Sequence, residues 1–199
     1  MTTKIKIISV VLWLLVVVSP VTAGCGSDTH YGKTPVFTFQ DTYNNGSWGY
    51  AVQIPKGYKG ASFSDPGANQ HGINIVLSPK SEIYINGEAN SLEDESTGEP
   101  LDSIGHSINN LNRIRQNAAE IKSYELRKAK LGKLSGTFYI VHYTCPEAAD
   151  VFIEEGIIAV SSDKSPLYDI TLQTTAKRYQ KDHSIFKRIA AKWRQIPRK

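Results

Sequence analysis

Cysteine and methionine are the scarcest residues of this chain, with two cysteines and one methionine among 199 residues. Neither a C-x-x-C pair nor an H-x-x-x-H pair is present, so the spacing gives no support for a zinc site. A G-x-S-x-G nucleophile elbow and a glycine-rich phosphate loop are also absent. The five histidines are His30, His71, His106, His142 and His183. The sequence therefore predicts no metal, no cofactor and no catalytic residue.

The charge of the chain is unevenly distributed. Residues 177–199 hold nine Lys and Arg against one acid, a balance of +8, whereas residues 25–176 hold twelve basic and eighteen acidic residues, a balance of −6. Nucleic-acid binders usually carry a basic face interleaved with aromatic residues or a known module, and the body of this chain has neither. The basic tail is typical of the solvated face of a terminal helix. A contact with anionic lipid headgroups or with an acidic partner is the alternative.

Residues 1–24 have the three-part organisation of an export signal. Lys4 and Lys6 form the positive part, and residues 7–18 form an apolar run that is too short for an ordinary spanning helix. Pro20 then interrupts the helix, and small residues follow it. We predict a signal peptide over residues 1–24, a flexible tether over 25–34 and one globular domain over 35–199, in a protein that works outside the cytoplasm.

The first cysteine, Cys25, allows two interpretations of the mature N-terminus. Residues 21–25 resemble a bacterial lipoprotein box, with Thr22 in place of the usual leucine. This resemblance implies a lipid on Cys25, and Gly26 is similar to a signal for an outer-membrane position facing the periplasm. Residues 21–23 also fit an ordinary A-x-A-like cleavage site, which would leave two cysteines in an oxidising compartment and favour a Cys25–Cys145 disulfide. Acylation would instead leave Cys145 as a lone thiol, most simply a buried one.

Hydrophobic spacing predicts the order four strands, helix, four strands, helix. The expected strands are 35–40, 49–54, 73–77 and 83–85, the first two forming a hairpin, and then 123–130, 135–145, 151–160 and 167–174. The first helix, opened by Pro100 and Asp102, has an apolar stripe of Ile104, Ile108, Leu111, Ile114, Ala118 and Ile121. The last helix, capped by Thr174 or Thr175, has a stripe of Tyr179, Phe186, Ile189, Ala190 and Trp193. Short turns require antiparallel pairing, so the predicted fold class is α+β, a largely antiparallel sheet with two main helices packed on it.

Two stretches resemble PsbP-like proteins. Residues 50–58 (Tyr-Ala-Val-Gln-Ile-Pro-Lys-Gly-Tyr) are similar to the opening strand of that family, and the strand 168–172 with a terminal helix holding Phe186 and Trp193 is similar to its end. The resemblance covers residues 35–196 and implies a PsbP-like α/β sandwich that binds partners or assembles complexes. In size and expected address, the chain is also similar to periplasmic immunity proteins that block toxins from competing cells.

The acidic stretch between residues 88 and 99 is the candidate binding surface. It holds five acids without the D-x-[DN]-x-[DN]-G spacing of a calcium loop. Trp48, in the aromatic-rich early loops, is expected to form an anchor-rich surface together with Glu93, Asp94 and Glu95.

Two further positions have weaker functional interpretations. Glu154 and Glu155 interrupt an apolar strand, which would bury one of them and raise its pKa, but the following Gly156 favours a bulge or a hairpin tip. His142 and Cys145 are three residues apart in an expected strand. Their side chains would point to opposite faces, which argues against a Cys–His catalytic pair.

These observations together indicate a non-catalytic binding lipoprotein of the cell envelope. Its expected partner is a protein, and an immunity protein that binds and blocks a toxin is the specific hypothesis. An envelope hydrolase and an assembly factor for a membrane complex are the alternatives. No nucleic acid is expected as a partner.

The first prediction is acylation of Cys25. Intact-mass analysis of membrane-purified protein is expected to show a chain that starts at Cys25 and carries acyl mass. The change Cys25→Ser is expected to release the protein from membranes without unfolding it. A soluble chain that begins at Gly24 and contains a Cys25–Cys145 disulfide would contradict this prediction.

Overall fold

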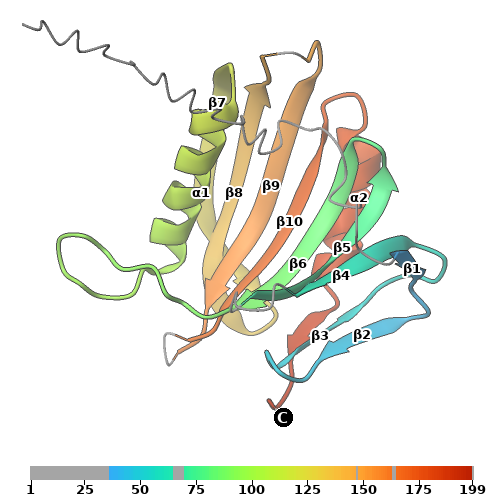
Figure 1. Cartoon of the computed structure of the whole chain (residues 1–199), viewed down its shortest axis with the longest axis vertical. Helices are drawn as coiled ribbons and strands as arrows, with labels where there is room; N and C mark the ends of the chain where they lie inside the picture. The colour runs from blue at the N-terminus through green and yellow to red at the C-terminus, as the bar shows by residue number, and fades with distance from the viewer. Residues whose placement is uncertain (1–35, 65–69, 147, 163–164, 199) are drawn as a thin grey trace, which may run out of the picture.

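The computed structural model describes residues 36–64, 70–146, 148–162 and 165–198, so the predicted signal peptide (1–24) and tether (25–34) lie outside the described residues. Eight antiparallel strands form the main sheet (Figure 1). Their order across the sheet is β1 (Val36–Thr38), β4 (Lys59–Ser64), β5 (Gln70–Ser78), β6 (Ser81–Glu88), β10 (Leu167–Thr175), β9 (Val151–Val160), β8 (Leu134–Thr144) and β7 (Glu120–Leu131). A smaller sheet has the order β11 (Trp193–Gln195), β3 (Tyr50–Gln53) and β2 (Thr42–Asn45).

Short turns determine most of the strand pairing. β7 and β8 are joined through Gly132, whose φ of 58° lies in the left-handed region that glycine adopts without strain. β5 and β6 form the hairpin that the sequence predicted. The predicted hairpin between residues 35–40 and 49–54 is wrong, because β1 pairs with β4 while β2 pairs with β3. The partner of β3 is β2, a strand that the hydrophobic spacing did not predict.

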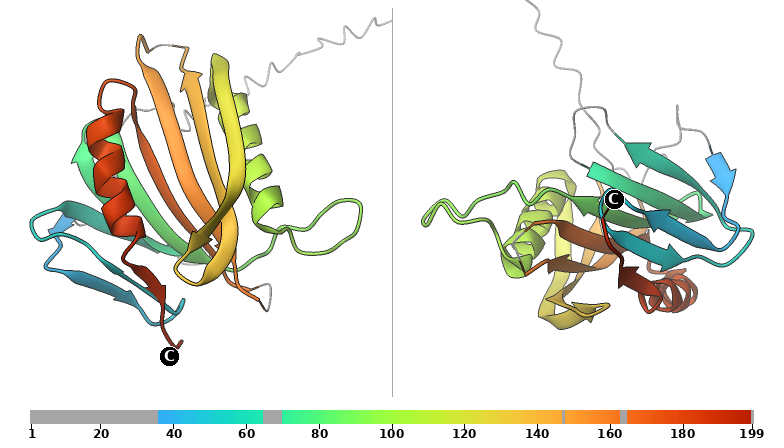
Figure 2. Two further views of the ribbon diagram at one scale, coloured as in Figure 1. Left: turned by 180° about the vertical axis from the view of Figure 1, so that it is seen from behind. Right: turned by 90° about the horizontal axis from the view of Figure 1, so that it is seen from below.

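The two helices cover opposite faces of the main sheet (Figure 2). α1 (Ser103–Asn117) packs on β7, β8 and β9, whereas α2 (Tyr179–Ala190) packs on β10 and contacts β3 of the smaller sheet. Consecutive residues of β9 show the alternation, since Glu154 bonds to α1 through Arg113 and Glu155 bonds to α2 through His183. An antiparallel sheet with two main helices confirms the predicted α+β class.

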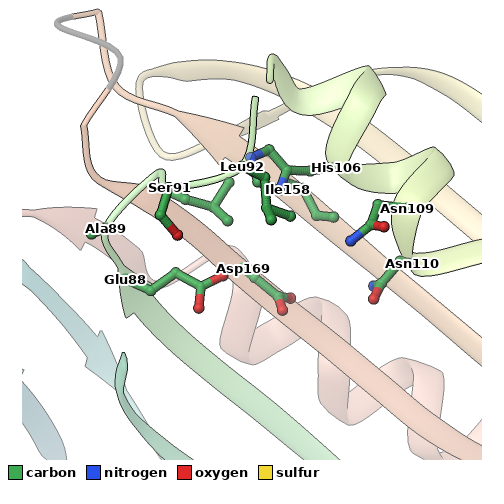
Figure 3. Close-up of a pocket in the computed structure, with 10 residues that line it drawn as sticks. Glu88, Ala89, Ser91, Leu92, His106, Asn109, Asn110, Ile158 and Asp169 are labelled. Atoms are coloured by element: carbon green, nitrogen blue, oxygen red, sulfur yellow. The ribbon is translucent and has the colours of Figure 1, made fainter. Parts of the chain in front are cut away.

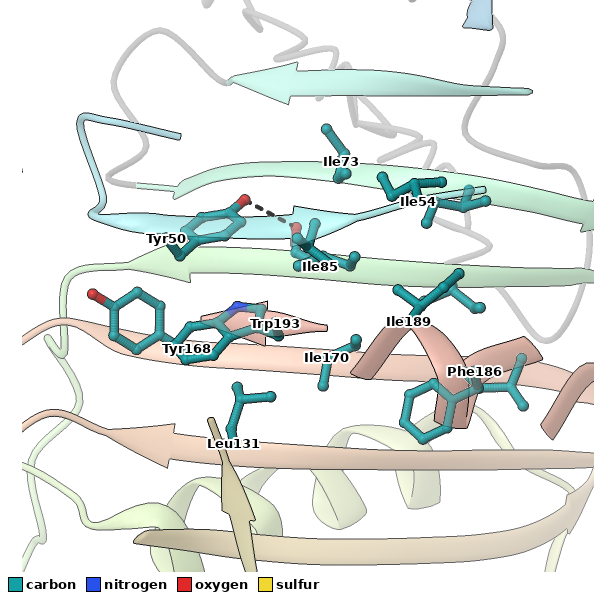
Figure 4. Close-up of a cluster of buried hydrophobic side chains, with 14 of the residues drawn as sticks. Tyr50, Ile54, Ile73, Ile85, Leu131, Tyr168, Ile170, Phe186, Ile189 and Trp193 are labelled. Carbon is teal, nitrogen blue, oxygen red and sulfur yellow. Dashed lines mark hydrogen bonds between the residues drawn. The ribbon is translucent and has the colours of Figure 1, made fainter. Parts of the chain in front are cut away.

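The main hydrophobic core lies between the main sheet and the layer formed by α2 and the smaller sheet (Figure 4). Three aromatic rings meet in it, with ring centres 6.3 Å apart for Tyr50 and Trp193 and 5.0 Å apart for Tyr168 and Trp193. Fully buried isoleucines from β5, β6 and β10 complete the floor: Ile73, Ile75, Ile83, Ile85 and Ile170. The smaller sheet is therefore attached to the main sheet by aromatic packing.

α1 begins where the sequence predicted but buries only part of the predicted stripe. The side chain of Asp102 accepts hydrogen bonds from two backbone N–H groups of the first turn, at 3.0 and 2.8 Å, as an N-cap does. Leu111 and Ile114 are buried in a second core on this face. Ile104 and Ile108 are 48% and 45% exposed, so the first half of the stripe does not reach the sheet.

α2 is shorter than the sequence predicted. It ends before Trp193, which lies in β11 instead of the helix, although Phe186 and Trp193 are both buried. Neither predicted threonine caps the helix, because β10 continues through both of them. The helix follows Arg178, which makes no side-chain cap bond, and the hydroxyl of Thr174 donates instead to the buried carboxylate of Asp182 at 2.7 Å.

The packing of Trp193 generates the second prediction. Trp193→Ala is expected to lower the free energy of unfolding by about 3–5 kcal/mol, because it removes a buried ring and leaves a cavity beside Tyr50 and Tyr168. Arg194→Ala, at an exposed neighbour on the same strand, is the matched control and is expected to change it by less than about 0.5 kcal/mol. Urea unfolding measures both values. Equal midpoints for the two variants would show that β11 contributes nothing to the core.

Candidate functional site

A pocket of about 260 Å³ lies between α1 and the adjoining ends of β6 and β10 (Figure 3). The residues that line it are Glu88, Ala89, Ser91, Leu92, His106, Asn109, Asn110, Ile158, Leu167 and Asp169. β6 ends at Glu88, so the chain that leaves the sheet there forms one wall and α1 forms another. The carboxyl groups of Glu88 and Asp169 lie next to one another, with Asn109 and Asn110 on the α1 side. We call this space the acidic pocket.

The floor of the acidic pocket continues into a chain of polar contacts along the sheet. The hydroxyl of Thr171 lies 2.5 Å from Oδ1 of Asp169 and 3.0 Å from the hydroxyl of Tyr139. The Tyr139 hydroxyl lies 3.1 Å from Oε1 of Glu154, and the guanidinium of Arg113 donates to the same oxygen from α1 at 3.1 Å. The chain therefore connects the pocket to a buried carboxylate and its ion-pair partner.

Gly156 leaves the space that this chain of polar contacts needs. It lies between Tyr139 and Thr171 on three neighbouring strands, and a Cβ at this position would be 2.6 Å from the Tyr139 ring and 2.6 Å from Oγ1 of Thr171. Only glycine leaves room for the tyrosine ring to cross β9 and reach β10. The predicted bulge is wrong, because β9 keeps continuous register here and both Glu154 and Glu155 are buried.

The number of protons in this chain of polar contacts indicates which of its carboxyl groups is ionised. Three contacts separate the carboxyl groups of Asp169 and Glu154, but the two hydroxyls between them, of Thr171 and Tyr139, supply only two protons. All three contacts are hydrogen bonds only when one of the two carboxyl groups is protonated. Because the Arg113 guanidinium stabilises the ionised form of Glu154, the additional proton belongs on Asp169.

The environment of Asp169 supports this assignment. Burial raises the pKa of Asp169 to about 7, and the nearby charges of Glu88 and Glu154 also raise it, against the hydrogen bond from Thr171. Burial also raises the pKa of Glu154, and Arg113 opposes that shift. Asp169 therefore exchanges a proton near neutral pH.

Hydrogen-bond acceptors predominate in and beside the acidic pocket. Besides Glu88 and Asp169, the Oδ1 atom of Asn86 lies on the same face, directly opposite Asp169 across β6 and β10. That atom is buried and has no hydrogen-bond partner among the described residues. Burial lowers the pKa of His106, whose Nε2 lies 2.7 Å from Oδ1 of Asn90, so this histidine adds no positive charge at neutral pH. A ligand with N–H donors and a positive charge fits this set of groups.

Residues 89–102, which we call the acidic loop, carry the predicted partner-binding acids and extend beside the base of α1 (Figure 1). Glu93 and Glu95 are exposed. Asp94 organises the loop instead, because its Oδ1 accepts hydrogen bonds from the hydroxyl and backbone N–H of Ser96 and from the backbone N–H of Thr97. These bonds lower the pKa of Asp94. Of the three predicted acids, Glu93 and Glu95 are the two whose side chains face solvent.

Trp48 does not lie on this surface. The side chain of Trp48 is half-buried against the main core. It lies close to β6, because a Cβ built on Gly87 would be 2.9 Å from the Cβ of Trp48. Its carbonyl accepts a hydrogen bond from the hydroxyl of Tyr168 at 2.8 Å. The expected combination of Trp48 with the acids does not occur, because the early aromatics pack into the core. The apolar residue that the loop does expose is Leu92, at 43%.

Sequence reasoning missed three residues of the site: Asp169, Asn110 and Arg113. The available signal was Asp169, a single acid within an apolar strand. Asn110 and Arg113 lie three residues apart on the polar side of α1. The sequence does not show which side of this helix faces the part of the sheet that forms the acidic pocket. Sequence reasoning also missed the partners of Glu155 on the opposite face of the sheet. Its carboxylate bonds to His183 and accepts a hydrogen bond from the hydroxyl of Tyr179 at 2.9 Å.

The second cysteine bears on how the N-terminus is processed. Cys145 is buried and disulfide-bonded, and the other cysteine of the chain, Cys25, lies outside the described residues. Acylation of Cys25 and a Cys25–Cys145 disulfide would use the same sulfur atom, so they exclude each other. The state of Cys145 agrees with the disulfide alternative, and acylation of Cys25 stays a prediction that the mass measurement decides.

Within the described residues, no group of three or more His, Cys, Asp or Glu side chains is arranged to hold a metal ion. Neither helix of the described part is long and apolar enough to cross a membrane.

Comparisons with known proteins concern the fold. No protein-family model and no curated protein matches the chain. It is similar to cyanobacterial PsbP (CyanoP) from Synechocystis sp. PCC 6803, with 14% identity and a TM-score of 0.48 over 86% of this chain and 98% of that one. It is also similar to LpqN, involved in cell envelope biogenesis of Mycobacterium tuberculosis, with 8% identity and a TM-score of 0.37 over 84% of this chain and 94% of that one. At these identities and TM-scores neither likeness bears on function.

The proton on Asp169 generates the third prediction. A carboxyl group whose pKa is raised to about 7 in the folded state binds more protons there than in the unfolded chain between pH 4 and 7, so its contribution to stability falls as the pH rises through that range. Asp169→Asn keeps both an acceptor and a donor beside the hydroxyl of Thr171 and removes the titration. The variant is expected to be more stable than the native protein by about 1–3 kcal/mol at pH 8, with a smaller difference at pH 4.

Thermal unfolding at several pH values measures this difference. Glu95→Gln, which changes an exposed acid of the acidic loop, is the control for the loss of one negative charge. A difference between Asp169→Asn and the native protein that stays constant from pH 4 to pH 8 would show that Asp169 does not hold the proton.

Proposed function

We propose that this protein is a non-catalytic binding protein of the cell envelope that captures a basic segment of a partner protein. The acidic pocket receives an arginine or lysine side chain, and the acidic loop attracts the segment around it. The observation that carries the proposal is the charge of this region. Residues 88–112 hold six acids and no lysine or arginine, and they adjoin a pocket in which acceptors predominate. An arginine or lysine side chain supplies both donors and charge.

Arg113, a cation of α1 close to the acidic pocket, is already engaged. The guanidinium of Arg113 donates to Glu154 and, through Nε, to Oδ1 of Asn110 at 3.2 Å. Asp169 lines the pocket and holds a proton near neutral pH, so a cationic ligand would displace that proton when it binds. By linkage, the affinity for a cation then rises as the pH increases through about 7.

Leu92 supports a protein partner over a small cation. It lines the acidic pocket and is one of three large hydrophobic side chains exposed among the described residues. An apolar side chain beside a charged pocket gives a partner a place to bury carbon as well as to pair charge. A free amine or metal ion would use only the charge.

The cellular setting and the partner are further parts of the proposal. The export signal expected over residues 1–24 supports an envelope location. A toxin from a competing cell is the proposed partner, because blocking a toxin requires a complementary surface and no chemistry. The support for this partner is the acidic surface, which gives a basic toxin an attractive field.

An envelope hydrolase is the second candidate, and the paired carboxyl groups favour it. Asp169 has a pKa of about 7 and lies beside Glu88 in one pocket. Glycoside hydrolases use one protonated and one ionised carboxyl group in this way. Release of sugar fragments from peptidoglycan in excess of the protein, abolished by Asp169→Asn, would support the hydrolase and overturn the non-catalytic proposal.

The fourth prediction tests the pocket with a short peptide. An acetylated Gly-Arg-Gly amide is expected to shift the backbone amide resonances of Asn109, Asn110 and Asp169, with an affinity that rises from pH 6 to pH 8. The same peptide with citrulline, a neutral isostere of arginine, is expected to bind at least about tenfold more weakly. In Asp169→Asn the pH dependence is expected to disappear. Equal shifts with both peptides would contradict the proposal.

The fifth prediction tests the acidic loop. Glu93→Lys combined with Glu95→Lys is expected to slow association with an immobilised arginine-rich peptide by about tenfold at low salt, with little change in dissociation, because charges at a rim act mainly on encounter. Adding Asp94→Lys tests the third predicted acid, although this change also breaks the turn that Asp94 holds.

The control for the loop is a charge reversal elsewhere. Glu120→Lys with Glu125→Lys changes two exposed acids of β7 and gives the same net charge. If both double variants slow association equally, net charge alone acts and the acidic loop is not the binding surface. Single substitutions of His106, His142 and His183 are expected to leave association largely unchanged.

A further inference from the structure

A groove of about 440 Å³ is lined by residues of α2, β9 and the β7–β8 hairpin. α2 lies on the face of the main sheet opposite α1 and the acidic pocket (Figure 2, left). Three apolar side chains form its floor: Phe138 of β8, Ile157 of β9 and Phe186 of α2. The volume lies in the range of small-molecule sites. We call this space the basic groove.

Positive side chains border this apolar floor. The guanidinium carbon of Arg127 lies 4.0 Å from the centre of the Phe138 ring, so the cation is fixed over the floor by a cation–π contact. Lys187 lines the groove from α2. Glu125 lies 3.6 Å from Nε of Arg127, but both side chains are exposed, and an exposed ion pair neutralises the cation only weakly.

His183 adds an oriented polar group. Its Nδ1 lies 2.5 Å from Oε1 of the buried Glu155, and its ring lies against that of Tyr179 with the centres 5.0 Å apart. Because Nδ1–H donates to this carboxylate, Nε2 carries the lone pair of the neutral imidazole and accepts a hydrogen bond from a ligand. The buried carboxylate therefore fixes the imidazole before any ligand arrives.

We propose that the basic groove binds a single-chain amphiphile with an anionic head group. The alkyl chain lies on the floor, and the carboxylate or phosphate pairs with Arg127 and Lys187. A small inorganic anion would leave the apolar floor in water, and a neutral lipid would leave the cations unpaired. Only a molecule with both parts matches the groove. This site lies on the other face of the sheet and does not depend on the acidic pocket.

The test uses monomeric laurate, below its micelle concentration, with the full-length protein. Laurate is expected to shift the amide resonances of Phe138 and Ile157, whereas methyl laurate, which lacks the charge, and acetate, which lacks the chain, are each expected to bind at least about tenfold more weakly. Dodecyl phosphate distinguishes a phosphate head from a carboxylate head. Phosphatidylglycerol vesicles test the other source of this chemistry, an intact anionic bilayer.

A matched pair of variants separates the groove from the general basicity of α2. Arg127→Gln with Lys187→Gln removes two charges at the groove, and Lys181→Gln with Arg188→Gln removes two exposed charges of α2 that do not line it. The first pair is expected to weaken laurate binding at least about tenfold and the second to leave it unchanged. All four positions are outside the core, so both variants are expected to keep the native melting temperature.

Three outcomes would overturn the proposal. The first is equal weakening of laurate binding by the two pairs of variants, and the second is equal binding of laurate and methyl laurate. The third is binding of the vesicles without any binding of laurate or dodecyl phosphate, which would show a membrane-facing basic surface instead of a ligand groove.

Discussion

Two adjacent carboxylates in the middle of the main sheet determine the chemistry of both of its faces. Glu154 and Glu155 follow one another in β9, so their side chains point in opposite directions, and both are buried. A buried charge requires partners on its own face. α1 supplies Arg113 to one and α2 supplies His183 to the other. Each helix therefore has to present one particular side chain toward β9, which restricts its rotation and its position along the strand more than apolar packing would.

The α1 face carries more polarity than stability requires. Replacing a buried ion pair by well-packed apolar residues is often neutral or stabilising, whereas removing one partner costs about 3–5 kcal/mol. Here the ion pair of Arg113 and Glu154 is extended by hydroxyls to Asp169, and Asn86 opposite Asp169 leaves a buried acceptor without a partner among the described residues. Departures from the rules of folding concentrate at functional sites. The polar chain and the acceptor together favour binding as the reason that this face is not apolar.

The sequence predicted the α+β class, most strands and both helices, because hydrophobic spacing reports which face of an element is buried. It misassigned what depends on long-range packing. Ile104 and Ile108 continue the stripe of α1 in sequence but do not reach the sheet, and Trp193 follows the helical spacing of α2 although the chain has already entered β11. The site was found only in part, since the acidic loop was visible as a run of charge. Asp169 can be recognised as a site residue only from its neighbours in space, which three other elements supply.

The division of charge along the chain becomes a division across the sheet. The acidic loop leads into α1 on one face, whereas the described basic residues after 176 lie in or next to α2 and β11 on the other. A basic partner and an anionic amphiphile would therefore approach from opposite sides without competing. The two sites share β9, where Glu154 is joined to the acidic pocket through hydroxyls and Glu155 is joined to the basic groove through His183. Because β9 is hydrogen-bonded to strands on both sides, its backbone holds the two carboxylates in place, and each site can fill without displacing the side chains of the other.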